Sequence, residues 1–281
     1  MAELIYTNEG NLTGLVKVDG NMPEVTAKGL KFHLSRDIYT EEGYFPYRTM
    51  ARIGYGPSRG WEVKLGIEHW IGFSVYLEGP WLIDNLTEVI FQVKGLPDVE
   101  LGEQIQPLNP ILPIRIKETY IDVISRGDSR PLTIKPYENE ELYNIGEYVV
   151  DEWMHFVIHY LPSYTDGLLQ MWLNDRPVVG QTGPNCFNDK RGPALDFGIY
   201  KPHWRTGKTG GNDSIRERTL YIKNINIAIG SEGYNLVDPS QEEPTPPPPV
   251  DDHEEILGHI QALQTAVEDL ANITEGGIEL M

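Results

Sequence analysis

Residues 151–204 read DEWMHFVIHYLPSYTDGLLQMWLNDRPVVGQTGPNCFNDKRGPALDFGIYKPHW, and this stretch decides the fold of the 281-residue chain. Aromatic and β-branched residues alternate with other types in its first part, as they do in a β-strand. Asp166-Gly167 and Asn174-Asp175 are turn sequences between such runs. The stretch divides into four expected strands: 153–160, 168–173, 176–181 and 194–200. It therefore predicts an antiparallel sheet in which each strand returns beside the previous one.

The last of these strands carries a candidate site. Side chains alternate between the two faces of a strand, so Asp196, Gly198 and Tyr200 share one face. Lys201 and His203 follow the strand directly. This arrangement is typical of the edge of a concave site.

The remainder of the chain also reads as short strands. They are expected at 4–6, 15–18, 29–34, 47–53, 70–77, 88–94, 114–117, 120–125 and 220–229. Residues 96–113 read as a proline-rich loop and 126–136 as a polar loop, and no helix of ordinary length is expected before residue 250. Many short strands separated by turns predict an all-β protein, and we expect a curved jelly-roll sandwich.

Two of these strands present polar side chains on one face. In 47–53, Arg48, Met50 and Arg52 share a face. In 88–94, Ile90, Gln92 and Lys94 share one face, and the other face (Val89, Phe91 and Val93) is apolar and is expected to face the core.

Composition limits the possible partners. The net charge of −19 argues against nonspecific binding to nucleic acid or to an anionic membrane. The single cysteine, Cys186, excludes an internal disulfide. The N-terminal sequence MAELIYTNEG lacks the basic and apolar regions of a signal peptide, and no apolar run is long enough to cross a bilayer.

The C-terminal part differs in kind from the rest. We expect four segments: a jelly roll at 1–238, a proline-rich linker at 239–250, an amphipathic helix at 251–275 and a tail at 276–281. The helix carries an apolar stripe at three- and four-residue spacing: Ile256, Ile260, Leu263, Val267 and Leu270. A helix this short is marginal alone, so self-association through 256–270 into a dimer or trimer is expected. The alternative is docking on the sandwich or on a larger partner.

The block 153–204 resembles the heparin lyase I-type and glucuronan lyase-type polysaccharide lyases. HWIGFSVYLEGPW, EVIFQVKG and NPILPIRIK, which begin at residues 69, 88 and 109, resemble the earlier strands of the same family, in the same order. The likeness covers about residues 10–230. It implies a concanavalin-like jelly roll, related in fold to the alginate lyases, that cleaves a uronate-containing glycan by β-elimination.

The resemblance also implies the site residues. Tyr200, Gln92 and Lys94 match catalytic positions of the family, and Arg48 and Arg52 match positions that bind the acidic sugar. Lys201 and His203 are further candidates for substrate binding, and His203 is also a candidate base.

Three departures from the family pattern fall in these strands. Met50 stands where a Glu is expected, Lys94 where a His usually acts as the base, and Asp196 where a Lys is common. Tyr200 is then a candidate for both base and acid, with Gln92 and an arginine on the substrate carboxylate. Lys94 is a second candidate base. Alternatively, Lys94 and Asp196 form an ion pair in a site that has lost catalysis.

Two functions of different class remain open. One is a polysaccharide lyase acting on an acidic glycan, and the other is a non-catalytic glycan-binding or structural module. No cofactor is expected, no histidines are spaced as in a zinc site, and a structural calcium ion stays open. The linker and the helix indicate display on a larger assembly such as a phage virion, and the competing expectation is a cytoplasmic enzyme.

Overall fold

The computed structural model describes residues 1–36, 47–53, 63–104, 108–206 and 211–241. Residues 1–240 form one compact unit, which is described by itself. The predicted helix at 251–275 and tail at 276–281 lie outside the described residues, as does most of the predicted linker, so these boundaries stay predictions. Among the described residues, no helix is long and apolar enough to cross a membrane.

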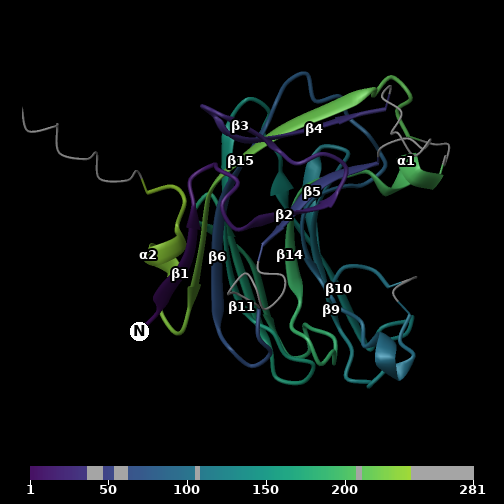
Figure 1. Cartoon of the computed structure of the whole chain (residues 1–281), viewed down its shortest axis with the longest axis vertical. Helices are drawn as coiled ribbons and strands as arrows, with labels where there is room; N and C mark the ends of the chain where they lie inside the picture. The colour runs from purple at the N-terminus through teal and green to yellow at the C-terminus, as the bar shows by residue number, and fades with distance from the viewer. Residues whose placement is uncertain (37–46, 54–62, 105–107, 207–210, 242–281) are drawn as a thin grey trace, which may run out of the picture. The chain divides into compact units, whose positions relative to one another are not determined.

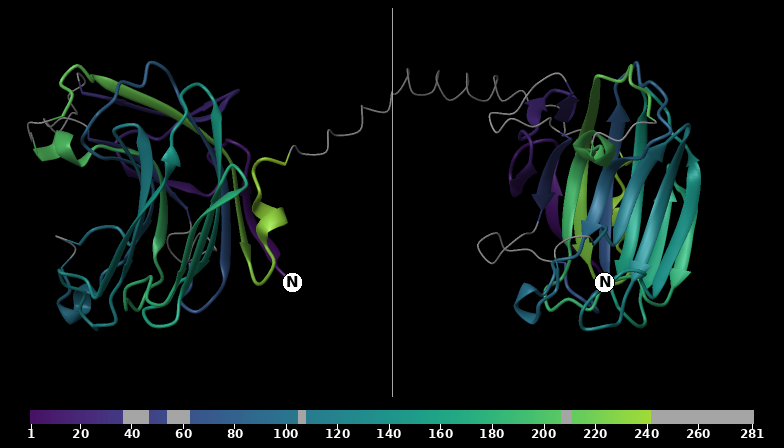
Figure 2. Two further views of the ribbon diagram at one scale, coloured as in Figure 1. Left: turned by 180° about the vertical axis from the view of Figure 1, so that it is seen from behind. Right: turned by 90° about the vertical axis from the view of Figure 1, so that its right-hand side faces the viewer.

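Two antiparallel β-sheets lie face to face (Figures 1 and 2). The eight strands of the first are β1 (Glu3–Asn8), β3 (Glu24–Thr26), β4 (Gly29–Ser35), β6 (His69–Leu77), β11 (Trp153–Leu161), β12 (Leu168–Leu173), β13 (Arg176–Thr182) and β15 (Glu217–Ile229). Their order is β13-β12-β11-β6-β15-β4-β3, and β1 pairs with β15.

The second sheet carries the candidate site. Its strands are β2 (Leu15–Asp19), β5 (Arg48–Ile53), β7 (Glu88–Lys94), β8 (Leu112–Lys117), β9 (Tyr120–Gly127), β10 (Asn139–Glu147) and β14 (Ala194–Tyr200). They run in the order β10-β9-β8-β7-β14-β5-β2. The described helices are short: η2 (Val99–Leu101), α1 (Pro202–Thr206) and α2 (Tyr234–Val237).

This architecture confirms the predicted all-β jelly-roll sandwich. Every strand expected from the sequence is present, with bounds that shift by a few residues. β3 and β10 were not predicted from the sequence. β10 has the sequence NEELYNIGE, and Ile145 is its one buried residue, because β10 lies at the edge of its sheet. An exposed edge strand carries little of the apolar alternation by which a strand is recognised.

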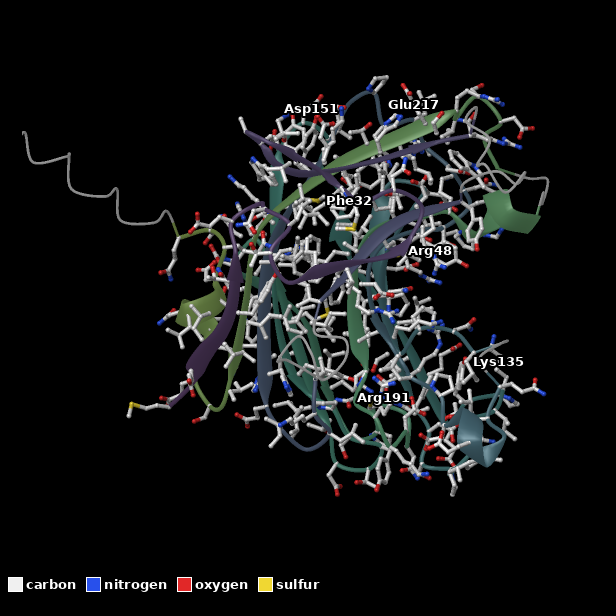
Figure 3. The ribbon with its side chains drawn as sticks, viewed as in Figure 1. Phe32, Arg48, Lys135, Asp151, Arg191 and Glu217 are labelled. Carbon is white, nitrogen blue, oxygen red and sulfur yellow. The ribbon has the colours of Figure 1, made fainter. Side chains whose placement is uncertain are left out.

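Four phenylalanines join the two sheets at their centre. Phe73 on β6 lies 5.0 Å from Phe91 on β7 and 5.2 Å from Phe197 on β14, between ring centroids. Phe73 also stacks on Phe156 of β11 at 5.2 Å, within its own sheet. All four rings are buried, as is Phe32, which Figure 3 shows between the sheets. Because Phe91 and Phe197 point inward, their neighbours Gln92 and Asp196 belong to the outer face of the seven-stranded sheet.

A β-bulge changes the alternation in β7. Val89 pairs with Arg115 and Phe91 with Ile114, so two steps along β7 match one step along β8 and Ile90 is the extra residue. Ile90 therefore joins the core, and Val89 faces outward beside Gln92. Simple alternation predicts the opposite face for each of these two residues, and that prediction is wrong because alternation cannot include a bulge.

Candidate functional site

A cavity of about 740 Å³ lies on the outer face of the seven-stranded sheet, and we call it the groove. Its lining comes from β5, β7, β8, β9 and β14, and from the segment 95–99 that follows β7. Five site residues that the family resemblance predicts line the groove: Arg48, Arg52, Gln92, Lys94 and Tyr200. The fold thus brings together residues that are up to 152 positions apart in sequence, from 48 to 200.

The groove is lined by cations although the chain is acidic. Six lining residues are Arg or Lys: Arg48, Arg52, Lys94, Arg115, Arg126 and Arg191. No Asp or Glu is among the described residues that line it. Figure 3 labels two of these residues, and in that view Arg48 lies above Arg191. In a chain of net charge −19, cations are therefore concentrated on the lining of the groove.

Asp196 lies under the floor of the groove. Its side chain has no exposed surface. Arg52 Nε donates to Asp196 Oδ1 at 2.5 Å and Arg52 Nη2 donates to Oδ2 at 2.9 Å, a bidentate pair between neighbouring strands. Gln92 Nε2 donates to the same Oδ2 at 2.8 Å. Asp196 therefore holds two side chains of the groove from below.

The proposed ion pair between Lys94 and Asp196 does not form. The carboxylate of Asp196 is taken by Arg52 and Gln92 instead, because Arg52 lies directly opposite it in the β5–β14 register. Burial lowers the pKa of the Lys94 ammonium below its ordinary value. The Asp196 carboxylate opposes this shift, while the charges of Arg48 and Arg52 add to it.

Tyr200 ends β14 at the wall of the groove. It pairs with Arg48 of the neighbouring strand β5, and the Arg48 guanidinium carbon lies 5.3 Å from the centre of the Tyr200 ring. Tyr47 packs beside it, with 5.9 Å between ring centroids, and the same guanidinium carbon lies 5.8 Å from the centre of the Tyr47 ring. Gly198 allows β14 to lie this close to β5, because at φ 134° a Cβ there would lie 2.2 Å from the carbonyl oxygen of Thr49. Tyr200 thus forms a cluster with one cation and a second aromatic ring.

Two further arginines are fixed by acids behind them. Arg115 on β8 donates Nε to Asp122 Oδ1 at 2.5 Å and Nη2 to Asp122 Oδ2 at 2.8 Å. Arg126 on β9 donates Nε to Glu140 Oε2 at 2.5 Å and Nη1 to the carbonyl of Pro110 at 2.6 Å. Such pairs fix the direction of each guanidinium before a ligand arrives.

Sequence reasoning missed Arg115, Arg126 and Arg191. The run Ile114-Arg115-Ile116 alternates, so this strand did carry a signal for Arg115 on the outer face. Arg126 follows the end of the expected strand, and Arg191 lies in a loop, where alternation says nothing.

Three other residues of interest lie away from the groove. The Lys201 ammonium is buried, 2.9 Å from Asp84 Oδ2 and 2.7 Å from Glu88 Oε1, so its assignment to substrate binding was wrong. His203 lies on α1 and does not line the groove. Met50 is buried between the two arginines of β5 and does not line it either.

Possible metal ligands are scattered. Within the described ranges, no group of three or more His, Cys, Asp or Glu is placed to hold a metal ion. The calcium question raised by the sequence therefore has no candidate ligand set in this part of the chain.

Residues 27–226 match the polysaccharide lyase family. The chain belongs to this family. Its structure is similar to that of endo-β-1,4-glucuronan lyase from the fungus Trichoderma reesei, with a TM-score of 0.64 at 16% identity, over 85% of this chain and 100% of that one. It is more distantly similar to alginate lyase Aly36B, with a TM-score of 0.48 at 13% identity, over 81% and 96% of the two chains. No curated protein matches this chain in sequence.

These findings confirm the resemblance to jelly-roll polysaccharide lyases. At such low identity the similar structures show the fold alone, so substrate and activity have to be argued from the groove.

Proposed function

We propose that this protein cleaves an acidic, uronate-containing polysaccharide by β-elimination in the groove. One observation carries the proposal: among the residues that the structure describes, six cations and no carboxylate line the groove of a chain whose net charge is −19. A polymer that bears carboxylates is the ligand such a lining favours. The family of the chain supports cleavage of a glycan by a lyase.

The reaction sets a definite requirement for positive charge. β-Elimination removes the C5 proton of a uronate, the C4–O bond to the next sugar breaks, and a C4–C5 double bond forms. Negative charge builds on the carboxylate as the proton leaves, so it must be stabilised by groups already in place. Arg48, Arg52 and Lys94 are the nearest cations to Tyr200 and Gln92 in the register of the sheet.

Tyr200 is the base and acid of this proposal. Two tyrosines line the groove, and Tyr200 is the nearer of them to the Arg48 guanidinium carbon, at 5.3 Å from its ring centre against 5.8 Å for Tyr47. In a syn elimination one group takes the C5 proton and then returns it to the leaving O4 oxygen, so a single tyrosine serves both steps. Lys94 is the competing base, because burial lowers the pKa of its ammonium and so shifts it toward the neutral amine that a base requires.

The test measures the product directly. Purified protein is incubated with a panel of polyuronates and glycosaminoglycans, and the ultraviolet absorbance of the unsaturated uronate is followed. We expect absorbance to rise with the wild type and not with Tyr200→Phe, which removes one oxygen and keeps the ring. A rise that persists in Tyr200→Phe and disappears in Lys94→Met would move the base to Lys94.

A second candidate function is a non-catalytic glycan-binding module. The observation in its favour is that no His, Asp or Glu is among the described residues lining the groove, which leaves Tyr and Lys as the candidate bases. Detectable binding of a polyuronate with a flat absorbance trace would establish this second function. Display on an oligomeric assembly such as a phage particle belongs to this proposal, through self-association of residues 256–270.

A further inference from the structure

The bond between Asp196 and Gln92 fixes the direction of the glutamine amide. Arginine is always a donor, so both oxygens of Asp196 act as acceptors toward the fork of Arg52. A third bond to Oδ2 must then also come from a donor. The nitrogen of the Gln92 amide, at 2.8 Å, therefore faces Asp196, and its oxygen faces the opposite way. This orientation follows from the chemistry of the partners, independently of how the two amide atoms are assigned.

The amide oxygen has no hydrogen-bond partner within the described part of the chain. Gln92 is 1% exposed, and its Oε1 atom accepts no hydrogen bond from the described residues. The neighbour of Gln92 on strand β8 is Pro113, which has no N–H to donate. Both Gln92 and Pro113 line the groove. Buried acceptors in proteins are rarely left unpaired, so this oxygen is available to a donor that enters the groove.

We propose that Asp196 is a positioning residue: it holds Arg52 in place and turns Gln92 so that the floor of the groove offers an acceptor to a hydroxyl group of the bound sugar. The inference rests on the proposed function for its substrate. It adds that the sugar at this point presents a free hydroxyl beside the carboxylate that the arginines bind. A sugar whose hydroxyls are esterified would leave the oxygen of Gln92 unpaired and buried.

The chain offers a matched control for this role. Asp122 holds Arg115 by the same two contacts, at 2.5 and 2.8 Å, and is 3% exposed. Asp122 lies opposite Arg115 in the β8–β9 register, and within the described part of the chain it makes no hydrogen bond to Gln92. Asp196→Asn and Asp122→Asn thus each remove the charge behind one groove arginine, and only the first changes the partner of Gln92.

The first measurement needs no activity. The side-chain amide of Gln92 is assigned in a ¹⁵N spectrum by its loss in Gln92→Met, and its hydrogen exchange is compared with that of exposed Gln104. We expect exchange at least about tenfold slower in the wild type and in Asp122→Asn, and fast exchange in Asp196→Asn. Exchange in the wild type as fast as that of Gln104 would overturn the proposal, even if Asp196→Asn does not fold.

The second measurement uses the reaction. Misplacing a substrate-binding group by about 1 Å can cost on the order of 10²-fold in rate. We expect Asp196→Asn to lower kcat to that extent, and Asp122→Asn to act mainly on KM through Arg115. Equal losses of kcat in the two variants would overturn the proposal. A wild type without lyase activity would instead remove the proposed function, while the amide exchange still decides the role of Asp196.

A third measurement compares the affinity of the protein for a polyuronate oligosaccharide and for its O-acetylated form. We expect the wild type to bind the free form about tenfold more tightly, as one hydrogen bond to a buried acceptor predicts. We expect this preference to disappear in Gln92→Met. Equal affinity of the wild type for both forms would contradict a hydroxyl partner for Gln92.

Discussion

The ammonium of Lys201 lies 2.7 Å from Glu88 Oε1 inside the protein, although Tyr200, the preceding residue, lines the groove. Glu88 also accepts from Arg218 Nε at 2.9 Å, and Lys201 donates to Asp84 as well. This buried network ties the end of β14 to the start of β7. It anchors the backbone on which Tyr200 is carried.

Replacing Lys201 should therefore cost stability rather than substrate affinity. Lys201→Met leaves Asp84 and Glu88 buried without the ammonium, and removing one partner of a buried ion pair costs about 3–5 kcal/mol. Urea unfolding measures the loss, and KM of the folded protein should stay near its wild-type value. Lys190→Met is the control, because the pair of Lys190 with Glu100 is exposed, and its loss should cost no more than about 1 kcal/mol. A stable Lys201→Met variant with a raised KM would instead indicate that Lys201 binds the substrate.

The cations of the groove should make ligand binding depend on salt. Charged hydrogen bonds contribute about 1.5–3 kcal/mol each, so Arg48→Gln should weaken binding of a polyuronate by about tenfold or more. Binding to the wild type should also weaken as salt rises, because the screening length falls from about 30 Å at 0.01 M to about 8 Å at 0.15 M. Isothermal titration at several salt concentrations measures both effects.

The control for this prediction lies on the other sheet. Lys31→Gln, on β4, removes the same unit of charge away from the groove. If it weakens binding as much as Arg48→Gln does, the effect belongs to net charge and not to the groove.

Asp189 should make stability depend on pH near neutrality. Burial, and next the nearby Glu103 carboxylate, raise the pKa of the Asp189 side chain from 3.8 to about 7. Between these values the folded state holds a proton that the unfolded state has lost. The stability contributed by protonation is complete below about pH 3.8 and is lost as pH rises through about 7.

Asp189→Asn tests this linkage. The amide stays neutral, and its oxygen can still accept from the backbone N–H of Leu96, which bonds Asp189 Oδ2 at 3.0 Å. At pH 8 the free energy of unfolding of the variant should exceed that of the wild type by on the order of 2–4 kcal/mol, at about 1.4 kcal/mol per pKa unit. This gap in stability should close below about pH 4. Urea unfolding at several pH values measures the gap. A constant gap across this range would show that Asp189 is not the titrating group.

The sequence predicted the groove where local alternation suffices. Gln92 was placed on the correct face because it lies beyond the bulge of β7, and Tyr200 because β14 stays in continuous register with β5 as far as Arg48. Val89 was misplaced because the bulge at Ile90 arises from pairing with β8, which no local pattern records. Lys201 was misplaced for a different reason: alternation ends with the strand, and the buried carboxylates that attract its ammonium come from residues 84 and 88.

The C-terminal helix should determine the oligomeric state. Residues 256–270 carry the apolar stripe that predicts a coiled coil, and one charge in such a seam leaves an ion without water. Leu263→Asp in the full chain should convert a dimer or trimer into a monomer, as measured by light scattering after size-exclusion chromatography. Gln264→Asp places the same charge on the neighbouring position outside the stripe and should keep the oligomer. A wild-type chain that is already monomeric would contradict self-association and would favour docking of the helix on the sandwich or on a separate partner.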